Sequence, residues 1–340
     1  MFRKFFLPLA LAVSFLLGAC VSPAATVTPT TIPIAVPPTA TIAPTAIPTV
    51  APTAAPTVEP SPTPIAHTDG LGHQVTLATP AQRIVSLGPS NTEVLFALGA
   101  GAQVVGRDDL SDYPEAAKQV TGVGATYGNF SAESIVALKP DLVLMAEIYT
   151  PEQVKALTDL GLTVYWLANP KDFDGLYVNL AIVGQLTGHA EEAAKLADAL
   201  KGRVAAVAGK VKGATAKPKV FYELDATDPA KPYTTGPGTF VDMLITLAGG
   251  ENVGAVLKDQ YAQISSEELV KQNPDIILLG DAAYGVTVES VGQRAGWGSI
   301  AAVKNQRVFV FDDNLTSRPG PRLVDGLETL AKLIHPESFK

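Results

Sequence analysis

The sequence predicts an α/β protein with two similar lobes, each holding a parallel sheet, joined by one long rigid helix. Three observations predict this fold: an amphipathic run over residues 189–212, a motif that recurs on both sides of it, and short apolar runs typical of buried strands. A chain of 340 residues that is 47% hydrophobic can build two domains of ordinary size. A ligand would bind in the crevice between such lobes.

The connecting helix is predicted from the spacing of its apolar residues. They recur every three or four positions, as on one buried helical stripe: Ala193, Ala197, Leu200, Val204, Val207 and Val211. Glu191 and Glu192 begin the run and Lys210 and Lys212 end it, which suits the helix dipole. Such a helix would be about 35 Å long.

The repeat is visible on either side of this helix. ESIVALKPDLVL begins at Glu133, and EELVKQNPDIILL begins at Glu267. In both segments a carboxylate opens a short helix, a Pro-Asp pair follows, and an apolar strand comes next. A second match pairs LFALGAGAQVVG (95–106) with LITLAGGENVG (244–254). The sequence therefore predicts two copies of one α/β unit.

The beginning of the chain predicts a membrane anchor. Arg3 and Lys4 precede the apolar run 5–17, which is typical of a signal peptide and too short for an ordinary membrane span. Cys20 is the only cysteine and ends LGAC, which resembles the bacterial lipobox. In that motif the leader is cut before the cysteine and its sulfur carries a diacylglycerol. Two acyl chains suffice for stable anchoring, so we expect an extracytoplasmic protein held on the cell membrane by lipidated Cys20.

Residues 21–66 consist mostly of Pro, Thr and Ala with almost no charge. They cannot bury a core, and they favour an extended, semi-rigid tether. The expected domains are the leader with its lipobox (1–20), the tether (21–66), a first lobe (67–172), connecting helices (173–213) and a second lobe (214–340).

The first lobe is expected to begin near His67 with a hairpin at Asp69-Gly70. Its predicted strands cover 83–87, 104–106, 142–145 and 164–167. A helix over 92–98 follows the first strand, with Ser90 or Asn91 as its N-cap. Small polar residues between a strand and a helix N-terminus favour ligand binding, so Ser90 is a candidate contact.

A helix over 173–187 precedes the long one. In the second lobe the predicted strands cover 219–224, 276–279 and 308–311, and helices cover 240–247 and 323–333. Trp166 lies in an apolar strand and is expected in the core, and Trp297 is expected to pack on a helix of the second lobe.

Five segments together resemble the class III (cluster A-II) substrate-binding proteins of ABC importers. These segments are RIVSLGPSNTEVLFALGAG, SDYP, ESIVALKPDLVL, YTTGPGTFVDMLITLAGGENVG and SEELVKQNPDIILL. The resemblance covers residues 67–337 and implies two Rossmann-like lobes with little closure on ligand. It also implies delivery of cobalamin, a ferric siderophore or haem to a permease and its ATPase, and a monomer without a cofactor of its own. Glu133 and Glu267 match the family's acidic contacts to the permease, although both would also suit the first turn of a capped helix.

The resemblance is strongest to the cobalamin binders. Tyrosines fall on loops expected at the crevice, where flat faces suit a large planar ligand. They are Tyr113, Tyr127, Tyr149, Tyr233 and Tyr261.

Ferric siderophores and haem are the alternatives within the family. Anionic siderophores would need arginines, for which Arg107, Arg318 and Arg322 are the candidates. Arg318 is retained as a ligand contact. Haem would need an axial Tyr or His, such as Tyr127 or Tyr233. A bare metal ion would need clustered His and carboxylates, which the sequence lacks, so no metal site is expected.

Other classes are less favoured. The formal charge of −8 gives no case for nucleic acid. No catalytic residue is expected, because GxGxxG after a strand, GxxxxGK[ST], GxSxG and HExxH are all missing. A tethered surface enzyme, or a receptor or adhesin without a permease, stays open as an alternative.

Overall fold

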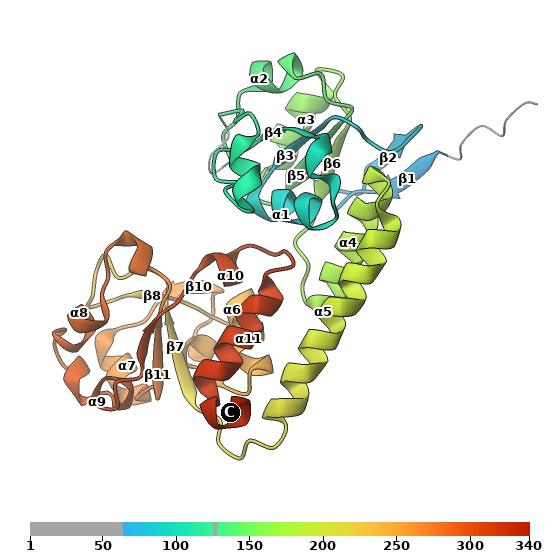
Figure 1. Cartoon of the computed structure of the whole chain (residues 1–340). Coiled ribbons are helices and arrows are strands. Elements are labelled where there is room, and N and C mark those ends of the chain that lie inside the picture. Colours follow the sequence, from blue (N-terminus) through green and yellow to red (C-terminus); the bar gives the residue numbers. More distant parts are fainter. Residues whose placement is uncertain (1–63, 125–127) are drawn as a thin grey trace, which may run out of the picture. The chain divides into compact units, whose positions relative to one another are not determined.

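The computed structural model describes residues 64–124 and 128–340 of the chain (Figure 1). They form two α/β lobes with parallel sheets, which confirms the predicted fold class. Over these residues no helix combines the length and the apolar character that a membrane span requires.

The first lobe contains one four-stranded parallel sheet in the order β4-β3-β5-β6. Its elements are β1 (Ile65–Thr68), β2 (Gln74–Leu77), β3 (Ile84–Leu87), α1 (Pro89–Ala97), β4 (Val104–Arg107), α2 (Ala132–Ala137), β5 (Leu142–Ala146), α3 (Pro151–Thr158) and β6 (Val164–Leu167). β1 and β2 form the predicted antiparallel hairpin. It begins at Ile65, two residues before the expected start.

The second lobe repeats this topology. Its elements are β7 (Lys219–Glu223), β8 (Tyr233–Thr235), α6 (Phe240–Leu247), β9 (Glu251–Asn252), β10 (Tyr261–Gln263), α7 (Ser266–Gln272), β11 (Ile276–Leu279), α8 (Val288–Gly292), α9 (Ala301–Lys304), β12 (Val308–Val310), α10 (Asn314–Ser317) and α11 (Leu323–Ile334). The parallel sheet has the order β12-β11-β7-β9, so in both lobes the first strand lies between the second and the third. This identity of strand order confirms the repeat.

The repeated Pro-Asp motif builds the same turn twice. Lys139 and Asn273, just before the prolines, both have left-handed backbones, with φ of 48° and 49°. Asp141 then accepts the backbone N–H of Arg83 at 3.0 Å, and Asp275 accepts that of Lys219 at 2.8 Å. Each carboxylate thereby ties the start of the third strand to the start of the first.

The connecting helix α4 (Phe173–Thr187) has the predicted bounds, and α5 (Ala190–Val211) is one residue shorter at each end than the predicted 189–212. Gly188, with φ of 80°, turns the chain between them. α5 packs against α4 and also against α11 of the second lobe. Arg203 on α5 pairs with Asp325 and Glu328 on α11, at 2.6 and 2.8 Å. α5 thus contacts α4 through packing and α11 through both packing and ion pairs.

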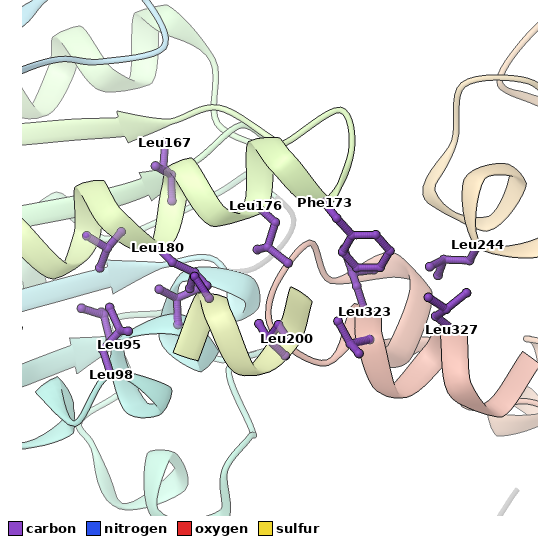
Figure 2. Close-up of a cluster of buried hydrophobic side chains, with 14 of the residues drawn as sticks. Leu95, Leu98, Leu167, Phe173, Leu176, Leu180, Leu200, Leu244, Leu323 and Leu327 are labelled. Atoms are coloured by element: carbon purple, nitrogen blue, oxygen red, sulfur yellow. The ribbon is translucent and has the colours of Figure 1, made fainter. Parts of the chain in front are cut away.

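One apolar cluster runs through the connecting helices into both lobes. It contains Leu95 of α1, Leu180 of α4, Leu200 of α5 and Leu327 of α11, all at most 3% exposed (Figure 2). A separate apolar cluster belongs to the first lobe alone and another to the second. β3, β5, β6 and β11 are buried at every position, as expected for strands of doubly covered parallel sheets. The shared cluster couples the lobes through side-chain packing.

The start of α1 differs from the prediction. The helix begins at Pro89 and is preceded by Gly88, with φ of 126° and no side-chain cap. Ser90 and Asn91 therefore lie inside the helix. Proline suits the first helical turn because its fixed φ is already helical, and Gly88 makes the sharp entry. Ser131 and Ser265 cap α2 and α7, where each side chain accepts the backbone N–H of the residue three positions later.

Candidate functional site

The carboxyl ends of the second lobe's strands surround an open cavity of about 780 Å³. Its lining comes from the segments that follow β7, β11 and β12, together with β8. These residues are Leu224, Asp225, Ala226, Thr227, Tyr233, Gly280, Asp281, Tyr284, Gly285, Val286 and Asp313. In parallel sheets ligands bind at this edge, where neighbouring strands lead their connections to opposite sides. The volume lies within the range of roughly 300–1,000 Å³ typical of ligand pockets.

A second cavity of about 660 Å³ adjoins the first. The two share Gly280, Tyr284, Val286 and Asp313, and the second adds Glu289 and Asp312. Among the described residues that line either cavity, the charged ones are all carboxylates. The cavity wall is therefore acidic as well as partly aromatic.

Asp281 is the most buried of these carboxylates, at 3% exposure. Its Oδ2 accepts the N–H of Ala226 at 2.9 Å, and its Oδ1 has no hydrogen-bond partner among the described residues. Burial raises the pKa of Asp281 to about 6, and the nearby Glu223 carboxylate adds to the rise. Glu223 itself is fully buried and forms a two-pronged ion pair with Arg294. Asp281 thus carries a buried charge without an ion-pair partner of its own.

Tyr233 and Tyr261 lie together on the ribbon formed by β8 and β10. Tyr233 is opposite Gln263, and Tyr261 is opposite Thr235. Strand alternation places the two tyrosines on one face of the ribbon, and they are 43% and 57% exposed. Burial and the charge of Asp313 raise the pKa of Tyr261, although Tyr261 itself is not part of the cavity lining. Tyr284, which the sequence analysis did not single out, is 84% exposed in the cavity lining.

The other expected ligand contacts are placed differently. Tyr149 is 2% exposed and packs against Phe130, with ring centroids 6.0 Å apart, so it presents no face to solvent. Burial raises its pKa well above the usual value. The strand residue Trp166 donates to the backbone oxygen of Tyr149 at 2.8 Å and is buried, as predicted. Ser90 is 8% exposed inside α1. Tyr127 lies outside the described residues.

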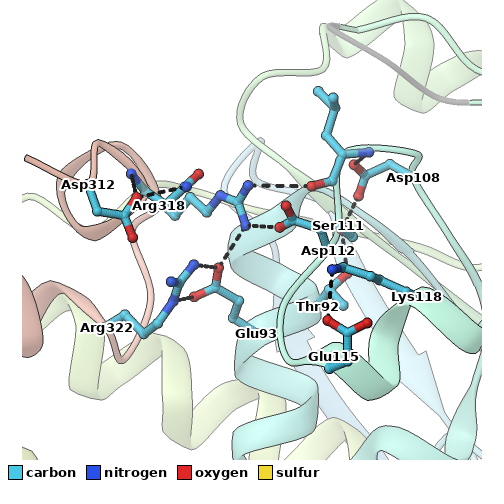
Figure 3. A network of polar contacts seen from close by, with 12 residues as sticks. Thr92, Glu93, Asp108, Ser111, Asp112, Glu115, Lys118, Asp312, Arg318 and Arg322 are labelled. Atoms are coloured by element: carbon cyan, nitrogen blue, oxygen red, sulfur yellow. Dashed lines mark hydrogen bonds and ion pairs between the residues drawn. The ribbon is translucent and has the colours of Figure 1, made fainter. Parts of the chain in front are cut away.

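A buried ion-pair cluster joins α1 to the segment before α11. Glu93 on α1, whose side chain is 2% exposed, accepts from Arg322 at 2.8 and 2.5 Å and from Arg318 at 3.1 Å (Figure 3). Arg318 also donates to Asp112 at 2.7 Å, and the Arg322 guanidinium lies 4.0 Å from the ring centre of Tyr113. We call these five side chains the Glu93 cluster. Nothing in the sequence pointed to Glu93, which has an ordinary position in an apolar helix.

The three arginines considered for anionic ligands are therefore already occupied. Arg318 and Arg322 belong to the Glu93 cluster. Arg107 donates to the backbone oxygens of Ala117 and Asp108, at 2.9 and 2.8 Å. An anionic chelate would have to break these bonds in order to recruit a guanidinium.

The paired glutamates occupy equivalent places in the two lobes. Glu133 is in the first turn of α2 and Glu267 in the first turn of α7, and each helix precedes the third strand of its sheet. Both are exposed, and no ion pair involves either within the described part of the chain. Trp297 is fully buried and donates to Ser266 at the start of α7, which agrees with its predicted packing.

The described residues contain no group of three or more His, Cys, Asp or Glu side chains that could hold a metal ion. Cys20 lies outside the described residues. The cavity carboxylates were missed from the sequence, although DATDP and GDAAYG each follow an apolar strand. Their position at strand ends was the signal that could have found them.

Comparison with known proteins agrees with this architecture. The family model for periplasmic binding proteins matches residues 84–315. An uncharacterized ABC transporter substrate-binding lipoprotein, YvrC of Bacillus subtilis, is 34% identical over 82% of this chain and 87% of its own. A cobalamin-binding protein of Halobacterium salinarum is 30% identical over 80% of this chain and 74% of its own. The apo structure of the periplasmic heme-binding protein RhuT from Roseiflexus is 29% identical, with a TM-score of 0.68 over 76% of this chain and 99% of its own. The chain therefore belongs to the periplasmic binding protein family, as a substrate-binding protein of the ABC-transporter type.

Proposed function

We propose that this protein captures cobalamin or a related corrinoid outside the cytoplasm and delivers it to an ABC permease and its ATPase. The observation that carries the proposal is the wide cavity at the strand ends of the second lobe, with Tyr233 and Tyr284 in its lining. Such a cavity suits a large, flat, mostly neutral ligand, because aromatic faces cover its ring and polar groups meet its rim. Similarity to a cobalamin-binding protein supports the same ligand.

Haem is the second candidate. Exposed Tyr233 has a phenol oxygen that could serve as an axial ligand, and the similarity to a heme-binding protein favours this possibility. Ferric siderophores have less support, because Arg107, Arg318 and Arg322 are held by internal partners.

The ligand is tested by titrating the purified protein with cyanocobalamin, haem and two ferric siderophores, followed by absorbance spectra and calorimetry. We expect cyanocobalamin to bind with micromolar or tighter affinity and the siderophores to bind more weakly. Binding of a siderophore or haem without binding of cyanocobalamin would overturn the choice of ligand.

Delivery to the permease is proposed to use Glu133 and Glu267, as one exposed acidic contact per lobe. Charge reversal of both to lysine is expected to abolish uptake in cells while the ligand affinity of the purified protein stays unchanged. Glu152 and Glu192 are matched controls, because each is an exposed glutamate in the first turn of another helix and lines neither of the two second-lobe cavities. Normal uptake by the Glu133→Lys/Glu267→Lys variant would remove the docking role.

We propose a monomer anchored by a diacylglycerol on Cys20, with residues 21–64 as the tether because β1 already begins at Ile65, and with the lobes divided at 172 and 214. The lipoprotein name of the Bacillus relative supports the anchor. Metabolic labelling with a radioactive fatty acid tests it: Cys20→Ser should lose the label and be released from membranes. Equal labelling of both forms would refute the anchor.

A further inference from the structure

Every charged side chain described in the walls of the two adjoining cavities is a carboxylate. Asp225, Asp281 and Asp313 line the first, and Asp312 and Glu289 are added by the second. No lysine, arginine or histidine lines either cavity among the described residues. A ligand that enters meets negative charge on every charged position of the wall.

Three arginines of the protein are already held by other partners. Arg294 gives both ends of its guanidinium to Glu223 and lies over the Trp297 ring at 4.5 Å. Arg318 and Arg322 are held by Glu93 and are only 13% and 14% exposed in their side chains. None of these arginines can turn to a ligand without leaving a buried carboxylate unpaired, which is costly.

Asp281 adds an observation independent of the acidic composition. It is 97% buried, it belongs to the cavity lining, and one of its carboxylate oxygens lacks any hydrogen-bond partner in the described chain. A buried carboxylate oxygen normally accepts at least one hydrogen bond. The missing partner, together with the uncompensated charge, indicates that this wall is suited to positive or N–H-bearing groups.

We infer that the second-lobe cavity selects a ligand whose rim carries amide N–H groups and rejects an equally large ligand whose rim carries carboxylates. The selection is electrostatic: a carboxylate beside Asp225, Asp281 or Asp313 is repelled at low local dielectric, whereas an amide N–H is attracted. The inference rests on the proposed function, because it specifies which chemical class of large chelate the site takes. The inference goes beyond the proposed function because it assigns the choice between amide and carboxylate rims to the carboxylates of the cavity wall.

Two corrinoids with the same ring form a matched pair of probes. Dicyanocobinamide has amides on its rim, and dicyanocobyrinic acid has carboxylates in their place. For the full-length protein at pH 7.5 and low salt, we expect dicyanocobinamide to bind at least about tenfold more tightly, since like-charge contacts cost several kcal/mol. The ratio should fall as salt is added, because exposed parts of the wall are screened.

The variant Asp281→Asn tests the wall itself. The single amide oxygen of asparagine must take the Ala226 N–H, so the charge is lost and an NH₂ donor replaces the free acceptor. We expect the affinity ratio to narrow at least about threefold. Asp228→Asn removes the same charge from a nearby exposed loop outside the cavity lining and should leave the ratio unchanged. Melting temperatures of both variants show that they are folded.

The outcomes separate the inference from the proposed function. Equal binding of the two corrinoids, or an unchanged ratio in Asp281→Asn, overturns the inference and leaves corrinoid binding intact. If neither corrinoid binds, the proposed function fails. If haem, with its propionate carboxylates, binds while both corrinoids do not, the inference fails as well, because the cavity then accepts the rim that it is inferred to reject. Failure of all three ligands to bind overturns both.

Discussion

Removal of the Glu93 carboxylate is the sharpest test of how the lobes are coupled. Glu93 accepts three N–H bonds from Arg318 and Arg322, and its side chain is 2% exposed. Glu93→Gln leaves two guanidiniums, both under 15% exposed, without their anionic partner. Loss of one member of a buried ion pair costs about 3–5 kcal/mol. Arg318 keeps Asp112, so we expect about 3 kcal/mol.

The assay is urea unfolding followed by circular dichroism, with calorimetry as a second readout. For a folded body of this size, a loss of about 3 kcal/mol lowers the melting temperature by roughly 5 °C. Glu191→Gln is the control, because the Glu191–Lys195 pair is about three-quarters exposed and should contribute under about 1 kcal/mol. A double-mutant cycle with Arg322→Gln should give a coupling energy above about 1.5 kcal/mol.

The reasoning is refuted if Glu93→Gln lowers the free energy of unfolding by less than about 1 kcal/mol, or if the cycle shows no coupling. Either result would mean that the cluster is as weakly stabilising as an exposed ion pair. The apolar cluster around Leu180 and Leu200 would then hold the lobes together alone.

Three further predictions follow from single sites. The pKa of Asp281 is raised to about 6, so the folded protein binds the carboxyl proton more tightly than the unfolded chain does. The charged carboxylate therefore lowers the free energy of unfolding above pH 6, and this destabilisation disappears as the pH falls toward 4. A rise of the pKa from 3.8 to about 6 corresponds to roughly 3 kcal/mol, so Asp281→Asn should be more stable than the native protein by up to about 3 kcal/mol at pH 7.5 and by little at pH 4, as measured by urea unfolding. A constant difference between the two pH values would contradict the raised pKa. Gly88→Ala should lose about 2–4 kcal/mol in the same assay, because φ is 126° and the new Cβ would lie 2.5 Å from that of Ala146. Tyr233→Ala and Tyr261→Ala should each weaken cyanocobalamin binding roughly tenfold by calorimetry; an unchanged Kd in both would exclude the β8–β10 ribbon from the site.

The repeat, the parallel strands and the connecting helices could all be predicted from the amino-acid sequence. These features are recorded in local periodicity: α4, α5, α6, β6 and β11 appear within a residue of their predicted bounds. The left-handed turns at Lys139 and Asn273 are equally local, whereas the hydrogen bonds that Asp141 and Asp275 accept from the first strand of each lobe span 58 and 56 positions of sequence. The start of α1 was predicted at 92 because Ser90 and Asn91 are common N-cap residues, whereas the helix begins at Pro89 after Gly88.

Which polar groups are free to bind a ligand depends on contacts that are seen in the folded protein and not in the sequence. Glu93 meets Arg322 across 229 positions of sequence, so no local pattern could show that the arginines are occupied. The sequence analysis expected both Tyr149 and Tyr233 on loops at the crevice. In the structure Tyr149 is buried against Phe130, whereas Tyr233 is exposed to solvent. The charge of Asp281 has no ion-pair partner among the described residues, because the nearby Arg294 pairs with Glu223 instead. Hydrophobic periodicity specifies the fold from neighbours in sequence, whereas charge, burial and accessibility depend on neighbours in space.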